Sequence, residues 1–77
     1  MWETNNNQLY RKFKFKNFSE AFAFMVRVAI EAEKADHHPR WCNEYSTVEI
    51  WLCTHEAGNV ITDKDYTLAK RIDELTG

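Results

Sequence analysis

Hydrophobic and polar residues alternate in the first part of the chain. In residues 9–15 the side chains fall on two faces, with Leu9, Phe13 and Phe15 on one and Tyr10, Lys12 and Lys14 on the other. A period of two residues is typical of a strand that is buried on one side. We also expect a short partner strand at residues 2–4, joined to residues 9–15 through the turn-prone run Asn5-Asn6-Asn7.

A second alternating segment spans residues 44–55. Its smaller face, which we expect beneath the helices, holds Val48, Ile50 and Leu52. The opposite face is large and mixed, as expected of a sheet face that meets solvent, a ligand or a partner, and it carries Tyr45, Thr47, Glu49, Trp51, Cys53 and His55.

Two segments have helical spacing. Residues 18–36 follow Asn17, a favourable N-cap, with Glu20 in the reciprocal capping position. Residues 63–75 follow Thr62, which forms a capping-box pattern with Asp65, and they turn Leu68, Ala69, Ile72 and Leu75 inward. The order β-β-α-β-α predicts an α+β fold, an antiparallel sheet with helices packed on one face.

The helix at 18–36 has two apolar stripes. One contains Phe18, Phe22, Met25, Val26, Ala29 and Glu33, and the second contains Ala21, Phe24, Val28, Ala32 and Ala35. One small sheet cannot cover both stripes. We therefore expect the second stripe to pack against another subunit, which predicts a homodimer or homotetramer.

Length and composition narrow the class of protein. A chain of 77 residues with 44% hydrophobic and 14% aromatic residues fits a single domain over residues 1–77. Its net charge of −2 argues against direct binding to nucleic acid. No apolar run approaches the roughly 20 residues that cross a membrane, and the N-terminus lacks a signal-peptide pattern. We expect a cytoplasmic protein in which Cys42 and Cys53 are free thiols.

The three histidines are the strongest candidates for chemistry. His37 and His38 follow the long helix directly before Pro39, and His55 ends the second alternating segment. Imidazole exchanges protons near neutral pH, so these residues suit acid–base catalysis. The His37-His38 pair fits equally well as a positive cap on a helix C-terminus. Glu33 lies one helical turn before His37, within reach of its ring.

A zinc site is the competing interpretation. His37, His38, His55, Cys42 and Cys53 are all acceptable zinc ligands, but no CxxC, HxxxH or HExxH spacing occurs. We therefore expect no metal and no other cofactor. Asp65, taken alone, fits a helix-capping carboxylate.

A longer pattern connects these residues. The string Glu33-Lys34-Ala35-Asp36-His37-His38-Pro39-Arg40-Trp41, then Tyr45, Thr54-His55-Glu56 and Asp65-Tyr66-Thr67-Leu68-Ala69, resembles the pterin-4a-carbinolamine dehydratase family. That family's signature is an acidic or similar residue, three residues, His-His-Pro, an aromatic residue, a later histidine and then an aspartate. The resemblance extends from Trp2 through the last helix. The family usually has a helix before the position of Trp2, and because the match starts at Trp2 we expect a fold without that helix. Asp63 competes with Asp65 for the family's aspartate, and the register of Leu68-Ala69 favours Asp65.

The resemblance implies a metal-independent dehydratase. The expected substrate is 4a-hydroxytetrahydropterin, converted to quinonoid dihydropterin and water in the recycling of tetrahydrobiopterin. By resemblance, His37 and His55 form the acid–base pair, and His38 binds and orients the pterin. Supporting roles fall to Glu33, expected beside His37, and to Asp65, expected beside His55. Trp41 and Tyr45 are candidates for lining the pocket or holding the loop, and they fit equally well as ordinary core aromatics.

The resemblance also implies an alternative function. Some animal members of the family bind the dimerisation helices of a homeodomain transcription factor, which would place such a coactivator in the nucleus as well. An apolar helical stripe suits that exchange of partners.

Overall fold

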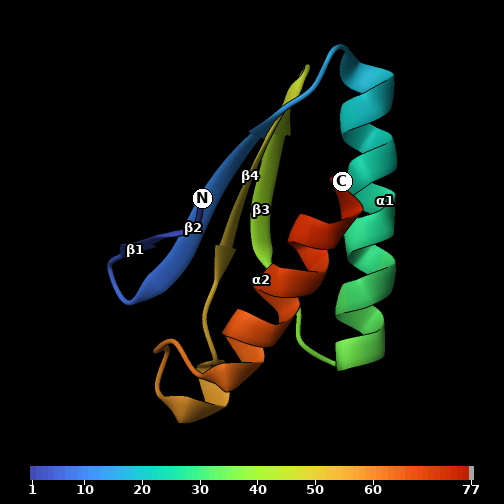
Figure 1. Cartoon of the computed structure of the whole chain (residues 1–77). Coiled ribbons are helices and arrows are strands. Elements are labelled where there is room, and N and C mark those ends of the chain that lie inside the picture. Colours follow the sequence, from blue (N-terminus) through green and yellow to red (C-terminus); the bar gives the residue numbers. More distant parts are fainter. Residues whose placement is uncertain (77) are drawn as a thin grey trace.

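A four-stranded antiparallel sheet forms one layer of the protein, and two helices form the other (Figure 1). The computed structural model describes residues 1–76. Along the chain the elements are β1 (Glu3–Asn5), β2 (Gln8–Lys14), α1 (Phe18–Ala35), β3 (Arg40–Glu44), β4 (Thr47–Leu52), the 3₁₀ turn η1 (His55–Ala57) and α2 (Asp63–Leu75). The strands lie in the order β1-β2-β4-β3, and both helices cover the same face of the sheet. The predicted α+β class is confirmed.

The first hairpin forms where the polar run predicted a turn. Thr4 pairs with Leu9, and Asn6 and Asn7 link the strands with positive φ angles of 53° and 63°. Asparagine tolerates this left-handed conformation better than most residues, and two such positions give a turn whose twist matches that of the strands.

Both helices begin at the predicted caps. The Asn17 side chain accepts a hydrogen bond from the Glu20 backbone at 2.9 Å, and the Glu20 carboxylate accepts one from the backbone N–H of Lys16, one residue earlier than expected. At α2 the capping box of Thr62 and Asp65 is complete. These local bonds satisfy N–H groups that the first helical turn leaves without a partner.

The sheet contains one strand more than the sequence predicted. β3 is an edge strand paired only with β4, and Trp41 is its one large apolar residue, so the hydrophobic pattern is too weak to reveal it. The predicted segment 44–55 is correspondingly shorter at both ends. Tyr45 has a positive φ of 48° in the β3–β4 turn, and Thr54 leaves the ladder to form a bridge with Val60.

The two stripes of α1 have exchanged the roles that we predicted. Ala21, Phe24, Val28 and Ala32 of the second stripe are buried against the sheet, whereas Phe18, Phe22 and Val26 of the first are about half exposed. Phe24 packs on the rings of Phe13 and Phe15, and α1 also packs along α2. The stripe that we expected to pack against another subunit therefore lies in the core, and the other stripe is the exposed one.

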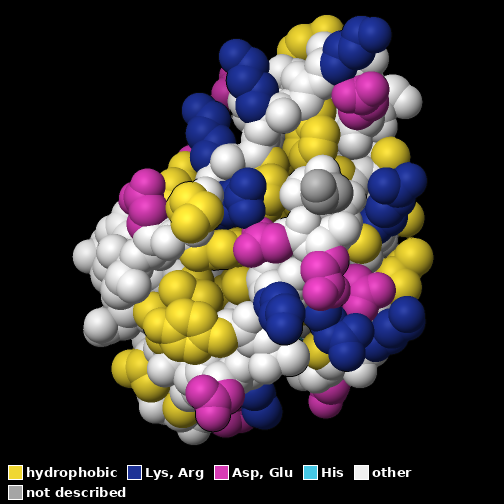
Figure 2. Space-filling view, viewed as in Figure 1, with side chains coloured by type: hydrophobic (Ala, Val, Ile, Leu, Met, Phe, Trp, Pro, Cys, Tyr) yellow, Lys and Arg dark blue, Asp and Glu magenta, His cyan; other side chains and the backbone are white. Residues whose placement is uncertain are grey.

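The core lies between the layers. The sheet contributes Leu9, Phe13, Val48, Ile50 and Leu52, and α2 contributes Leu68, Ala69 and Ile72. On the face shown in Figure 2, acidic and basic side chains are interspersed. Within residues 1–76, no helix has both the length and the apolar character needed to cross a membrane.

Candidate active site

The three histidines meet at one end of the molecule. The C-terminal end of α1, the turn η1 after β4 and the start of α2 all lie at the lower end in Figure 1. A cavity of about 240 Å³ at this end is lined by His37, His38 and His55 together with Asp36, Pro39, Arg40 and Glu56. No histidine side chain is visible on the face shown in Figure 2.

His37 is turned into the protein by the end of α1. Asp36 adopts the left-handed conformation, with φ of 50°, and the His37 backbone N–H then bonds to the Ala32 carbonyl at 3.1 Å. The ring is 7% exposed, and its Nε2 lies 2.5 Å from Oδ1 of Asp65. Because an ionised carboxylate only accepts hydrogen bonds, Nε2 carries the proton in this pair.

The second ring nitrogen of His37, Nδ1, is exposed at the cavity. Every buried side-chain nitrogen or oxygen in residues 1–76 has a hydrogen-bond partner. Nδ1 of His37 has no such partner in this part of the chain, so it is accessible to solvent at the cavity that the ring lines.

Asp65 is the buried centre of the network behind His37. It has no exposed surface, and its Oδ2 accepts hydrogen bonds from the Thr54 hydroxyl and the Thr62 backbone N–H, each at 2.8 Å. The capping carboxylate of α2 and the partner of His37 are therefore the same group. The capping role that the sequence predicted for Asp65 is confirmed, and the histidine that this carboxylate contacts is His37.

His38 points the other way, toward the last turns of α1. Its Nε2 lies 2.7 Å from Oε1 of Glu33, and both side chains are largely exposed. The sequence predicted that Glu33 would support His37. That pairing is wrong because the left-handed residue Asp36 sends His37 toward α2 and leaves His38 beside the helix.

His55 is held by its own turn. Its Nδ1 lies 2.6 Å from Oδ1 of Asn59, which follows Gly58 at a positive φ of 62°. The prediction that Asp65 supports His55 is wrong, because Asp65 contacts His37 and the hydrogen-bond partner of the His55 ring is Asn59. The sequence pattern predicted no role in the site for Asn59 or Thr54. A Gly-Asn pair closing a tight turn beside a histidine was the available signal for Asn59.

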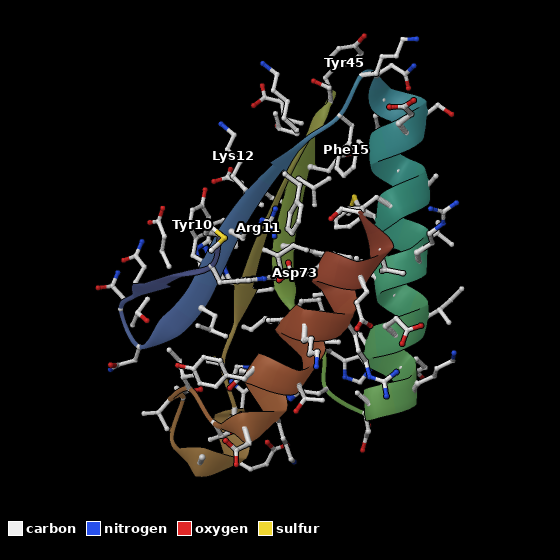
Figure 3. The ribbon with its side chains drawn as sticks, in the orientation of Figure 1. Tyr10, Arg11, Lys12, Phe15, Tyr45 and Asp73 are labelled. Carbon is white, nitrogen blue, oxygen red and sulfur yellow. The ribbon has the colours of Figure 1, made fainter. Side chains whose placement is uncertain are left out.

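Neither of the two aromatic candidates lines the cavity. Trp41 is half buried and packs against the core from β3. Tyr45 is 66% exposed in the β3–β4 turn, which Figure 3 places near the start of α1, at the far end of the sheet from the histidines. Of the two interpretations of Trp41, the core aromatic is the one observed.

Glu56 at the cavity and the two cysteines have shifted pKa values. A hydrogen bond from its own backbone and the nearby charge of Lys64 hold the pKa of Glu56 below its ordinary value, so the cavity rim carries a negative charge beside Arg40. Both cysteines are free, and burial is the first cause that raises the pKa of each thiol. Among residues 1–76, no three or more His, Cys, Asp and Glu side chains are grouped so that they could hold a metal ion.

Fold and site together define an α+β protein in which three imidazoles line one cavity, each anchored through one ring nitrogen. A family model described as pterin 4 alpha carbinolamine dehydratase matches residues 1–75. The chain therefore belongs to the pterin-4a-carbinolamine dehydratase family, whose enzymes are hydro-lyases.

Individual relatives agree with this assignment. A protein of Rhodospirillum rubrum, assigned by name to these dehydratases, is 55% identical over 69 residues, covering 90% of this chain and 71% of its own length. Its counterpart from Mesorhizobium japonicum is 54% identical over 74 residues, covering 96% and 74%.

Solved structures show the same fold. The crystal structure of a transcriptional coactivator/pterin dehydratase from Brucella melitensis matches with a TM-score of 0.93 and 41% identity, covering 99% of this chain and 82% of that one. A pterin dehydratase-like protein identified as a RuBisCO assembly factor matches with a TM-score of 0.80 at 23% identity, which shows a shared fold alone.

Proposed function

We propose that this protein catalyses the dehydration of a 4a-hydroxytetrahydropterin to quinonoid dihydropterin and water by histidine acid–base catalysis, without a metal. The observation that carries the proposal is the convergence of His37, His38 and His55 on one cavity. Each ring is anchored through one nitrogen, to Asp65, Glu33 and Asn59 respectively, which leaves the other nitrogen to exchange a proton with a ligand.

The reaction needs two proton transfers. The proton on N5 leaves, the N5 electron pair forms the C4a=N5 double bond, and the C4a–O bond breaks as the hydroxyl takes up a proton and departs as water. His37 and His55 are the acid–base pair in this proposal, and His38 binds and orients the pterin. General acid–base catalysis by positioned side chains contributes about 10²–10⁴-fold. Asp65 holds the ring of His37 in one orientation.

The test is the rate of 4a-hydroxytetrahydropterin dehydration at neutral pH. We expect His55→Ala and His38→Ala to remain folded, because both rings are outside the core, and to lose about 10²-fold or more in kcat/KM. Tyr45→Asn is the matched control, since Tyr45 was also a candidate but lies at the far turn, and it should keep the wild-type rate. A wild type that does not accelerate dehydration would overturn the proposal.

Metal independence has its own measurement. Protein purified without metal affinity and dialysed against a chelator should keep its full rate. Loss of the rate on chelation, followed by recovery with stoichiometric zinc, would overturn the metal-free mechanism.

We also propose that the protein is a homo-oligomer that associates through α1. The support is a stripe of exposed apolar side chains at four-residue spacing, namely Phe18, Phe22, Val26 and Ile30, each about half exposed. We call these four residues the outer stripe. Apolar side chains gathered on one helix face favour packing against another helix.

The outer stripe also supports a second candidate function, in which the protein binds the dimerisation helices of a transcription factor. Co-purification with a helical dimerisation peptide tests it. Retention of the peptide by wild type and its loss in Phe22→Glu would support this role, whereas no retention by wild type would exclude it for that peptide.

A further inference from the structure

Thr54 is a buried residue that bonds to the partner of His37 and directly precedes His55. It lies between β4 and η1, directly before His55, and its side chain is 3% exposed. Its hydroxyl oxygen lies 2.8 Å from Oδ2 of Asp65 and 2.6 Å from the hydroxyl oxygen of Thr62. The acid–base roles proposed above assign no part to this residue.

The direction of the hydrogen bonds around Thr54 is fixed by chemistry. The ionised Asp65 carboxylate can only accept, so the single hydroxyl proton of Thr54 is donated to Asp65. The Thr62 hydroxyl must then donate its own proton to Thr54, while it accepts from the Lys64 backbone N–H at 3.3 Å. The chain of donors therefore runs one way and ends on the carboxylate that holds His37.

The backbone of Thr54 anchors the turn that carries His55. Its N–H donates to the Val60 carbonyl at 2.8 Å, and its carbonyl accepts from the N–H groups of Ala57 at 3.2 Å and Asn59 at 3.0 Å. These bonds close the loop around η1 and place the Asn59 amide next to the His55 ring. One residue therefore contacts the supports of both histidines.

The two rings are held through different nitrogens. His37 is bonded through Nε2 to Asp65, and His55 is bonded through Nδ1 to the amide oxygen of Asn59. An amide oxygen only accepts, so the proton of a neutral His55 is on Nδ1 and its Nε2 is the basic nitrogen. In His37 the assignment is reversed, and Nδ1 is the basic nitrogen.

We propose that Thr54 is a positioning residue of this site: through its hydroxyl and Asp65 it fixes His37 in the Nε2–H tautomer, and through its backbone it holds the turn in which His55 adopts the Nδ1–H tautomer. The kinetic consequence rests on the proposed dehydratase function. The tautomers themselves can be measured without any substrate.

The experiment compares Thr54→Val, which removes the hydroxyl at nearly constant shape, with Thr54→Ser, which keeps it. Thr47→Val is the matched control, because Thr47 is the first residue of β4, at the opposite end of that strand from Thr54, and its hydroxyl donates to the Glu44 carbonyl. The first readout is the ¹⁵N NMR signature of the ring nitrogens, recorded above the pH range in which the histidines titrate. The second is kcat and KM for dehydration.

In the wild type we expect His37 as Nε2–H and His55 as Nδ1–H. Without the Thr54 hydroxyl, Oδ2 of Asp65 loses one of its two donors and the carboxylate can rotate away from His37. Thr54→Val should therefore give a mixture of His37 tautomers and a kcat lowered by about 10- to 100-fold, with KM changed by less than about twofold. Thr54→Ser should restore both, and Thr47→Val should alter neither.

Two results would overturn the proposal. One is a wild-type His37 in the Nδ1–H form, a measurement that does not depend on whether any variant folds. The other is an unchanged His37 tautomer in a folded Thr54→Val. A wild type without dehydratase activity would overturn the proposed reaction instead, and the NMR comparison would still decide the role of Thr54.

Discussion

At the residue scale, single carboxylates organise both the histidine site and the open face of the sheet. Asp65 accepts hydrogen bonds from three segments while fully buried. Glu49 of β4 is more exposed and joins the two neighbouring strands, since it accepts from the Tyr10 hydroxyl at 2.6 Å and from the Cys42 thiol at 3.7 Å. Burial strengthens such bonds, so the Asp65 network orders a site while the Glu49 pair mainly shifts protonation.

The first prediction concerns the protonation of Tyr10. The hydrogen bond to Glu49, followed by partial burial and by the charges of Glu49 and Glu3, raises the pKa of Tyr10 from 10.0 to about 12. Because the folded value is the higher one, its stabilising contribution is complete below pH 10 and is lost as the pH rises to about 12. Glu49→Gln should return the pKa of Tyr10 toward its ordinary value.

The measurement is the ultraviolet absorbance of phenolate, with Tyr10→Phe used to isolate this residue from the other tyrosines. Glu44→Gln is the control, because Glu44 lies on the same sheet face but is not among the groups that shift Tyr10. If Tyr10 still titrates at about 12 in Glu49→Gln, the assigned cause is wrong.

At the scale of elements, the N-terminal hairpin is tied to the C-terminal helix by Asp73. Oδ1 of Asp73 accepts from the Trp2 indole at 2.8 Å and from the Arg11 guanidinium at 2.6 Å. Figure 3 shows Arg11 and Asp73 side by side between β2 and α2. The Arg11 guanidinium also lies 4.4 Å from the centre of the Phe13 ring, which joins the ion pair to the core.

This contact predicts that Asp73→Ala lowers the free energy of unfolding by about 1 kcal/mol, because two donors lose a partner that is only partly exposed. Urea denaturation measures the loss as a lower midpoint at unchanged slope. Glu74→Ala, an exposed neighbour in the same helix, should stay within about 0.5 kcal/mol of wild type. Equal midpoints for the two variants would show that the contact adds nothing.

At the scale of the whole molecule, the two faces of α1 have different tasks. The inner face fills the core with small residues and Phe24, and the outer stripe remains uncovered in a single chain. A helix with apolar side chains on both faces is stable in water when a partner covers the second face. The histidine cavity lies at the C-terminal end of the same helix, so association through the outer stripe would fix the position of that end as well.

The corresponding prediction is that the wild type is larger than one chain in solution and that Phe22→Glu dissociates it. A charge at the centre of an apolar contact stays unpaired when the contact forms, which costs several kcal/mol. Light scattering coupled to size-exclusion chromatography measures the mass. Tyr66→Glu is the control, because Tyr66 is equally large and exposed but lies on α2. A monomeric wild type would contradict the prediction.

Much of the fold follows from local patterns. The alternation in residues 9–15, the cap at Asn17 and the capping box of Thr62 and Asp65 depend on neighbours a few residues apart, so they could be inferred directly. Strand β3 was not predicted from the sequence, because an edge strand needs little hydrophobic pattern of its own. The family was also recognisable, since the His-His-Pro string and its spacing to His55 and Asp65 are properties of the chain order alone.

The partners within the site were decided only by the tertiary structure. Sequence distance placed Glu33 near His37, yet one left-handed residue, Asp36, sends His37 to a carboxylate 28 positions away and gives Glu33 to His38. The face of α1 that enters the core was likewise decided by how the helix packs against the sheet and α2. The sequence by itself determined the two helices, the other strands, the family and the candidate histidines, because these depend on order and period. Only packing decided which group each histidine contacts, because a side-chain hydrogen bond depends on ångström distances between segments far apart in the chain.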